Sequence, residues 1–347
     1  MLIRAVMMMS DNNYLWDGSG EPDPEVLRLE RALGRLRSTP PPLRLPEPSR
    51  QRHLWSFVPL LATAAVLVLM AGLAWRSHVR RGTVWEVDRL AGQPIVGSTA
   101  VLGTGRLAVG ETLTTDASSR GRIKVNSIGQ VILEGNSRLR LLASGTGHYR
   151  LALDRGTLEA VISAAPGQFV IDTPAATATD LGCVYTLHVD DDGTGVLSVT
   201  TGWVAFEFNG RESFVPAGAS CRTDRRVGPG TPRFDDAAPE IQAALERFDF
   251  RATDAKRGAA LQLILGRARP RDALTLWHLL PRVDASERGA VFDALAARVP
   301  PPAGVTRERV LALERTVLDQ WWAALHLGEA SFWRGWKRPM PVPDRKR

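Results

Sequence analysis

The distribution of apolar residues divides the 347-residue chain into segments of different character. Residues 54–75 form an apolar run without a charged side chain. As a helix this run would span roughly 33 Å, which matches a bilayer hydrocarbon core of roughly 30 Å. Trp55 and Trp75 lie at its two ends, where indole rings favour the membrane interface. The pattern predicts one transmembrane helix anchored by these tryptophans, rather than a buried core helix or a cleaved signal peptide.

Residues 1–53 precede this run and contain one clear amphipathic signal. Asp23 followed by Pro24 is typical of a helix start, and we expect a helix over residues 24–36. Apolar residues with 3-4-3 spacing give this helix one apolar stripe, made of Val26, Leu29, Leu33 and Leu36. So short a segment cannot bury the stripe alone, so the helix either binds a groove of a partner or lies on the membrane or self-associates. Five prolines in residues 38–52 predict an extended spacer.

From residue 83 to residue 235 the pattern changes to short apolar or alternating runs separated by Gly, Asp and Ser. A spacing of about 8–12 residues between such runs is typical of an all-β sandwich, barrel or β-solenoid. The predicted strands cover residues 122–125, 131–133, 139–142, 149–153, 158–162, 169–171, 185–189, 195–199 and 203–208.

Beyond Pro239 the apolar period returns to 3.6 residues, and residues 236–330 are predicted to form an all-α domain. Prolines punctuate four or five helices of about 10–18 residues, which favours a helical bundle over a short solenoid-like stack. Three tryptophans of this domain are interpreted as core rather than as ligand-stacking residues: Trp277, Trp321 and Trp322. Residues 331–347 form a basic tail, either solvated or binding anionic lipid or envelope polymer.

Charge and motif content narrow the possible functions. The net charge is +7, but residues 236–347 carry 19 basic against 14 acidic residues and hold most of the excess. The basic composition is therefore a property of the C-terminal part, and we do not expect direct binding of nucleic acid. Histidines are scattered without metal-ligand spacing, and no nucleophile elbow or phosphate-binding loop is present in the sequence. We expect no enzymatic activity, no cofactor and no metal site.

The two cysteines, Cys183 and Cys221, both follow the predicted transmembrane helix. They form either a disulfide that closes a loop within the β domain or two buried free thiols. Such a pair suits an oxidising periplasm. The 20 residues before the apolar run carry five arginines and the 20 after it carry four, a difference too small to decide orientation. We expect a single-pass bacterial inner-membrane protein with a cytoplasmic N-terminus and periplasmic C-terminal domains.

Several stretches of the β segment resemble the FecR domain. The matching stretches are residues 110–115, 119–125, 131–139, 153–158 and, as the most specific part, Phe169 to Val204 with its Phe-Val-Ile-Asp-Thr-Pro opening and Val-Thr-Thr-Gly-Trp-Val end. Cys183 stands where the family usually has Thr, and Ile128-Gly129 replaces its usual Asp-Gly turn.

The resemblance implies a multi-domain, membrane-anchored signalling protein similar to FecR-like anti-sigma factors. A cytosolic segment would bind an extracytoplasmic-function sigma factor and regulate transcription. The periplasmic β domain over residues 83–235 would receive a signal from an envelope or outer-membrane receptor protein. The helical C-terminal domain departs from typical FecR proteins. The alternative is a non-catalytic envelope module that binds or scaffolds a glycan or protein partner.

Overall fold

The computed structural model describes four parts of the chain, residues 23–36, 84–145, 147–251 and 254–328. Helix α2 (Pro24–Gly34) belongs to a unit separate from residues 68–347, and each unit is described by itself. The helix starts as predicted, because the Asp23 carboxylate accepts a hydrogen bond from the Glu25 backbone N–H at 2.8 Å. The predicted helix is confirmed and ends two residues earlier than expected.

Eighteen strands form the β part of the larger unit within the described residues. They are β1 (Trp85–Ala91), β2 (Ile95–Val96), β3 (Thr99–Ala100), β4 (Thr104–Leu107), β5 (Thr112–Thr114), β6 (Arg120–Val125), β7 (Gly129–Leu133), β8 (Arg138–Gly145), β9 (His148–Ile162), β10 (Phe169–Asp172), β11 (Thr177–Asp180), β12 (Val184–Val189), β13 (Gly195–Thr201), β14 (Trp203–Phe208), β15 (Arg211–Pro216), β16 (Ala219–Asp224), β17 (Gly228–Pro229) and β18 (Arg233–Phe234). Each predicted strand is present.

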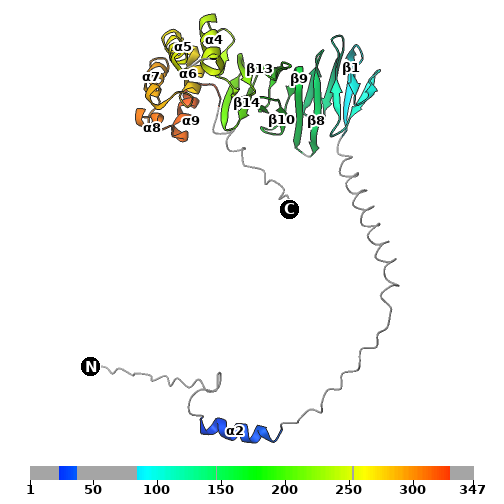
Figure 1. Ribbon diagram of the computed structural model, residues 1–347, viewed down its shortest axis with the longest axis vertical. Helices are drawn as coiled ribbons and strands as arrows, with labels where there is room; N and C mark the ends of the chain where they lie inside the picture. The colour runs from blue at the N-terminus through cyan, green and yellow to red at the C-terminus, as the bar shows by residue number, and fades with distance from the viewer. Residues whose placement is uncertain (1–22, 37–83, 146, 252–253, 329–347) are drawn as a thin grey trace, which may run out of the picture. The chain divides into compact units, whose positions relative to one another are not determined.

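The strands form two sheets that enclose a common apolar core. One sheet has the order β4–β1–β6–β7–β9–β12–β13–β16, with β17 and β18 beside β16. The other has the order β3–β2–β5–β8–β9–β10–β11–β14–β15. The chain passes between the sheets while it advances along both, so the architecture combines a sandwich with the progression of a solenoid. Figure 1 shows this advance from β1 at one end to β13 and β14 at the other.

Strand β9 belongs to both sheets, and it joins two strands that the sequence pattern predicts separately. Its first half pairs with β8 and β10, and its second half pairs with β7 and β12. Gly156 lies at the crossing with a φ of +91°, and a side chain there would collide with Ser137. A residue without Cβ is therefore needed for the strand to change sheets.

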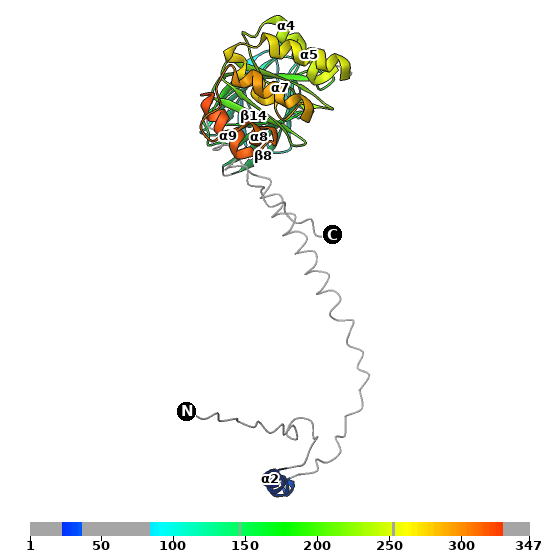
Figure 2. The same cartoon turned by 90° about the vertical axis from the view of Figure 1, so that its left-hand side faces the viewer.

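The helical segment lies at the β13–β14 end of the sheets (Figures 1 and 2). Its elements are α4 (Pro239–Glu246), the π-helical turn η1 (Arg247–Arg251), α5 (Asp254–Arg267), the 3₁₀ turn η2 (Pro270–Asp272), α6 (Ala273–Leu279), α7 (Ala285–Ala296), α8 (Arg307–Leu311) and α9 (Arg315–Ala324). Several are shorter than predicted. Leu313, with a φ of +56°, lies between α8 and α9 and separates them.

The β domain and the helical segment share one apolar core, so they form one compact unit rather than two loosely linked domains. Trp277, Trp321 and Trp322 are buried in it, as predicted. Within the described ranges, no helix has both the length and the apolar character needed to cross a bilayer. The predicted span over residues 54–75 with Trp55 and Trp75, and the basic tail over residues 331–347, lie outside those ranges.

Candidate functional site

The apolar stripe of α2 is the candidate partner-binding surface. None of the helix's side chains is buried, and Leu29, Leu33 and Leu36 are 60%, 56% and 77% exposed. Val26, the first residue of the stripe, is half-buried. Exposed apolar side chains at helical spacing are typical of a helix that binds a groove. The structure therefore places Val26, Leu29 and Leu33 on α2 and Leu36 in the turn after it, and it leaves these side chains uncovered among the described residues.

Cys183 lies in a buried cluster at the start of β12. Its thiol donates a hydrogen bond to the Asp180 carboxylate over 2.9 Å, and the Gly182 N–H donates to the same carboxylate over 2.6 Å. Burial raises the pKa of Asp180 to about 6. Burial, together with the neighbouring carboxylate, raises the pKa of the Cys183 thiol far above its ordinary value. The thiol is therefore protonated and poorly nucleophilic.

Cys221 lies on β16, and the sheet register separates it from Cys183. Cys221 pairs with Leu197 on β13, which pairs with Leu187 on β12, four residues beyond Cys183. Two strand spacings add to about 9–10 Å before those four residues are counted, and a disulfide needs Cα atoms within about 7 Å. Of the two alternatives left open by the sequence, the structure therefore shows the second, and both cysteines are buried free thiols. Burial raises the pKa of Cys221 to about 12.

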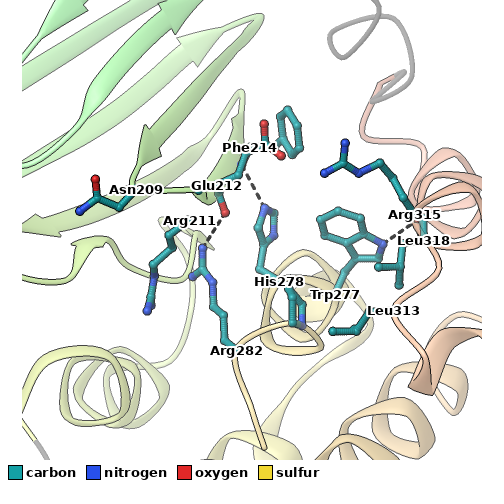
Figure 3. A pocket seen from close by; sticks show the side chains of 12 residues that line it. Asn209, Arg211, Glu212, Phe214, Trp277, His278, Arg282, Leu313, Arg315 and Leu318 are labelled. Atoms are coloured by element: carbon teal, nitrogen blue, oxygen red, sulfur yellow. Dashed lines mark hydrogen bonds between the residues drawn. The ribbon is translucent and has the colours of Figure 1, made fainter. Parts of the chain in front are cut away.

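The helical segment covers the outer edge of β15, which pairs with no described strand except β14. The Phe214 N–H on this edge donates to Nε2 of His278 over 3.0 Å, and Nδ1 of His278 donates to the Leu274 carbonyl over 2.8 Å. Arg282 donates to the Glu212 carbonyl over 2.9 Å (Figure 3). An open edge that would invite strand pairing is thereby capped by side chains of the helical segment.

A buried ion pair lies behind this edge. Arg211 of β15 donates to the Asp249 carboxylate over 2.6 Å, and the Asp249 side chain is 2% exposed. The same carboxylate accepts the N–H and hydroxyl of Thr231 at 2.6 and 3.1 Å. The sequence pattern gives no sign of this group, because its members lie up to 38 residues apart in the chain. Only the folded register brings them together.

Comparison with known proteins bears on the β domain. Residues 111–205 match the family model described as FecR protein. No curated protein matches the chain. Two crystal structures of a protein from Parabacteroides distasonis ATCC 8503, described as a candidate anti-sigma factor and solved at 1.65 and 2.50 Å, are similar at 14% identity with a TM-score of 0.32.

Each similarity covers 39% of this chain and 64% of that protein, less than two thirds of its length. The family match begins in the turn before β5 and ends within β14, and it contains the double-sheet strand β9. It includes most of the stretches on which the sequence resemblance rests, and it confirms that resemblance. The β domain of this chain is therefore similar to the FecR domain over residues 111–205.

Proposed function

We propose that this protein is a membrane-anchored, anti-sigma-factor-like signalling regulator. The observation that carries the proposal is the combination of a FecR domain with a separate helix whose apolar stripe is exposed. In this function α2 binds an extracytoplasmic-function sigma factor in the cytoplasm. Residues 54–75 cross the inner membrane, and the larger unit receives a signal from an envelope or outer-membrane receptor. The role is non-catalytic.

The buried cysteines do not support an exported location, because they form no disulfide. The proposed orientation therefore rests on the similarity to the FecR domain, because an apolar run alone has no direction. Alkaline phosphatase fused after residue 328, beyond the compact helical segment, tests it. Active fusions are expected, because the enzyme folds in the oxidising periplasm. Inactive phosphatase fusions, together with active fusions to a cytoplasmic reporter, would contradict the orientation.

The sigma-factor interaction is tested with the stripe of α2. We would replace Leu29 and Leu33 by Ala in the full chain, because Ala removes apolar surface and keeps helix propensity. The matched control replaces Arg28 and Arg31 by Ala on the opposite face. Each extracytoplasmic-function sigma factor of the host is tested for co-purification with the unaltered chain, with the leucine variant and with the arginine variant.

The leucine variant is expected to lose co-purification by more than about tenfold, and the arginine variant is expected to retain it. Transcription from promoters of the captured sigma factor should change in the leucine variant and stay the same in the arginine variant. Equal capture by all three proteins would remove the stripe as the binding surface. Capture of none of the sigma factors by the unaltered chain would favour an envelope binding or scaffolding function instead.

A further inference from the structure

A cavity of about 510 Å³ opens where β15 meets the helical segment. Small-molecule sites commonly measure about 300–1,000 Å³ and lie between structural units, so the cavity has the size and position of a ligand site. Its walls come from the β14–β15 turn, from β15, from α6 and the loop after it, and from the α8–α9 connection (Figure 3).

Cationic side chains are in excess in this cavity. Arg211, Arg282 and Arg315 line it, and Glu212 supplies the only carboxylate among its described lining residues. Asp249 neutralises Arg211 from behind. Arg315 lies on α9, is exposed, and has no hydrogen bond or ion pair to any described residue. Figure 3 shows its guanidinium extending from α9 toward Phe214.

Arg282 is held in place by neutral oxygens alone. Its Nη atoms donate to the Thr231 hydroxyl at 2.8 Å, the Ser213 hydroxyl at 2.6 Å and the Glu212 carbonyl at 2.9 Å. No carboxylate of the described residues forms an ion pair with it. Burial and the positive charge of Arg211 lower the pKa of Arg282 to about 10. A cation fixed at the wall of a cavity in this way is pre-organised for an anion, since ordering it costs nothing further on binding.

Trp277 and Leu313 give the cavity an apolar wall. Trp277 is fixed by a hydrogen bond from its indole N–H to the Leu318 carbonyl at 2.9 Å and by an edge contact with Trp322 at 4.8 Å between ring centroids. Leu313 lines the same wall in the left-handed backbone conformation, which is rare for a leucine. Such backbone strain clusters at ligand sites.

We propose that this cavity binds a small organic anion in which a carboxylate or phosphate is attached to a flat apolar body. Arg282 and Arg315 bind the oxyanion, because guanidinium groups match the geometry of carboxylate and phosphate oxygens. The apolar body contacts Trp277 and Leu313. This inference does not depend on sigma-factor binding, since all of the residues belong to the larger unit.

Calorimetric titration of the full chain with benzoate, phenyl phosphate and neutral benzamide tests the proposal. At least one of the two anions is expected to bind, and benzamide is not. The anion that binds more tightly identifies the ligand as a carboxylate or a phosphate. Absence of binding by both anions up to about 10 mM, or equal binding of benzamide, would overturn the proposal.

Two arginine variants assign the binding to the cavity. Arg315→Gln removes an exposed side chain without described partners, so it leaves the fold intact. Arg267→Gln makes the same change on an exposed arginine at the end of α5, outside the cavity lining. We expect Arg315→Gln to weaken anion binding by about tenfold and Arg267→Gln to change it less than twofold. Equal affinities in the two variants would place the anion elsewhere and refute the site.

Discussion

Helices α2 and α6 are both short, yet they differ completely in burial. Every residue of α6 from Ala273 to Leu279 is buried, whereas α2 buries none of its side chains. Helix α6 packs against the edge of β15 and against α9, whose tryptophans complete its surroundings. Helix α2 has comparable leucines but no described surface to cover them. The difference indicates that apolar residues of α6 stabilise the fold, whereas those of α2 are available for a partner.

The largest effect on the free energy of unfolding is expected from a substitution in the buried surroundings of α6. Trp322 is 2% exposed and contacts Trp277, His278 and Phe214, with ring centroids 4.8, 5.6 and 5.7 Å apart. Trp322→Ala is expected to lower the free energy of unfolding by about 3–5 kcal/mol, because it leaves a large cavity. Urea unfolding followed by circular dichroism measures this. The control Leu33→Ala in α2 should change it by less than about 0.5 kcal/mol, and equal losses in both variants would contradict the comparison.

Burial also changes the pKa of aspartate side chains, and this predicts that stability depends on pH. The pKa of buried Asp180 is raised from 3.8 to about 6 by burial, whereas hydrogen bonds from Ser119 and Ser118 lower the pKa of Asp116 at the surface. The folded protein therefore holds the Asp180 proton at pH values where the unfolded chain has released it. The stabilising contribution of this group is complete below about pH 4 and is lost as the pH rises through about 6.

The loss amounts to about 3 kcal/mol, since the pKa difference is about two and each unit corresponds to about 1.4 kcal/mol. Asp180→Asn should remove this part of the pH dependence of unfolding between about pH 4 and pH 7. Asp116→Asn serves as the control, because Asp116 lies at the surface and its pKa shifts the other way. Unfolding curves with the same pH dependence in Asp180→Asn and the unaltered chain would contradict the assignment.

A smaller effect is expected where α6 is joined to the sheet. His278→Phe removes the acceptor of the buried Phe214 N–H and should destabilise the larger unit by about 1–3 kcal/mol. His278→Gln retains a hydrogen-bonding side chain and should recover part of that loss. Hydrogen exchange of the Phe214 amide checks the cause, since this amide should exchange faster in the Phe variant. Unchanged exchange would show that the histidine does not protect the edge of β15.

The sequence pattern was sufficient for features that depend on neighbouring residues. The Asp23 cap and the spacing of the leucines predicted α2, and alternation predicted the strands of the β domain. Features that depend on register were missed. The sequence left a disulfide and two free thiols open for Cys183 and Cys221, because the spacing of the two residues says nothing about the strands between them.

The contacts that join the helical segment to the sheet were missed for the same reason. Arg282 and the Glu212 carbonyl lie 70 residues apart in the chain, and His278 and Phe214 lie 64 apart. An isolated arginine or histidine in an apolar helical pattern carries no signal of its partner. The break at Leu313 carries no signal in the sequence, because leucine ordinarily continues a helix and here adopts a left-handed conformation.

The smallest effect is expected from a substitution at the start of the exposed helix α2. Asp23→Ala removes the side-chain cap of α2 and should cost the helix about 1 kcal/mol, without changing the unfolding of residues 68–347. If the partner binds α2 as a helix, this cost appears as a roughly fivefold weaker affinity for the captured sigma factor. Asp23→Asn retains an oxygen that caps the helix and should bind as tightly as the unaltered chain. An Asp23→Ala variant with full affinity would show that the partner binds the leucines whether or not residues 24–34 are helical. The stripe would then be a linear motif rather than a preformed helical surface.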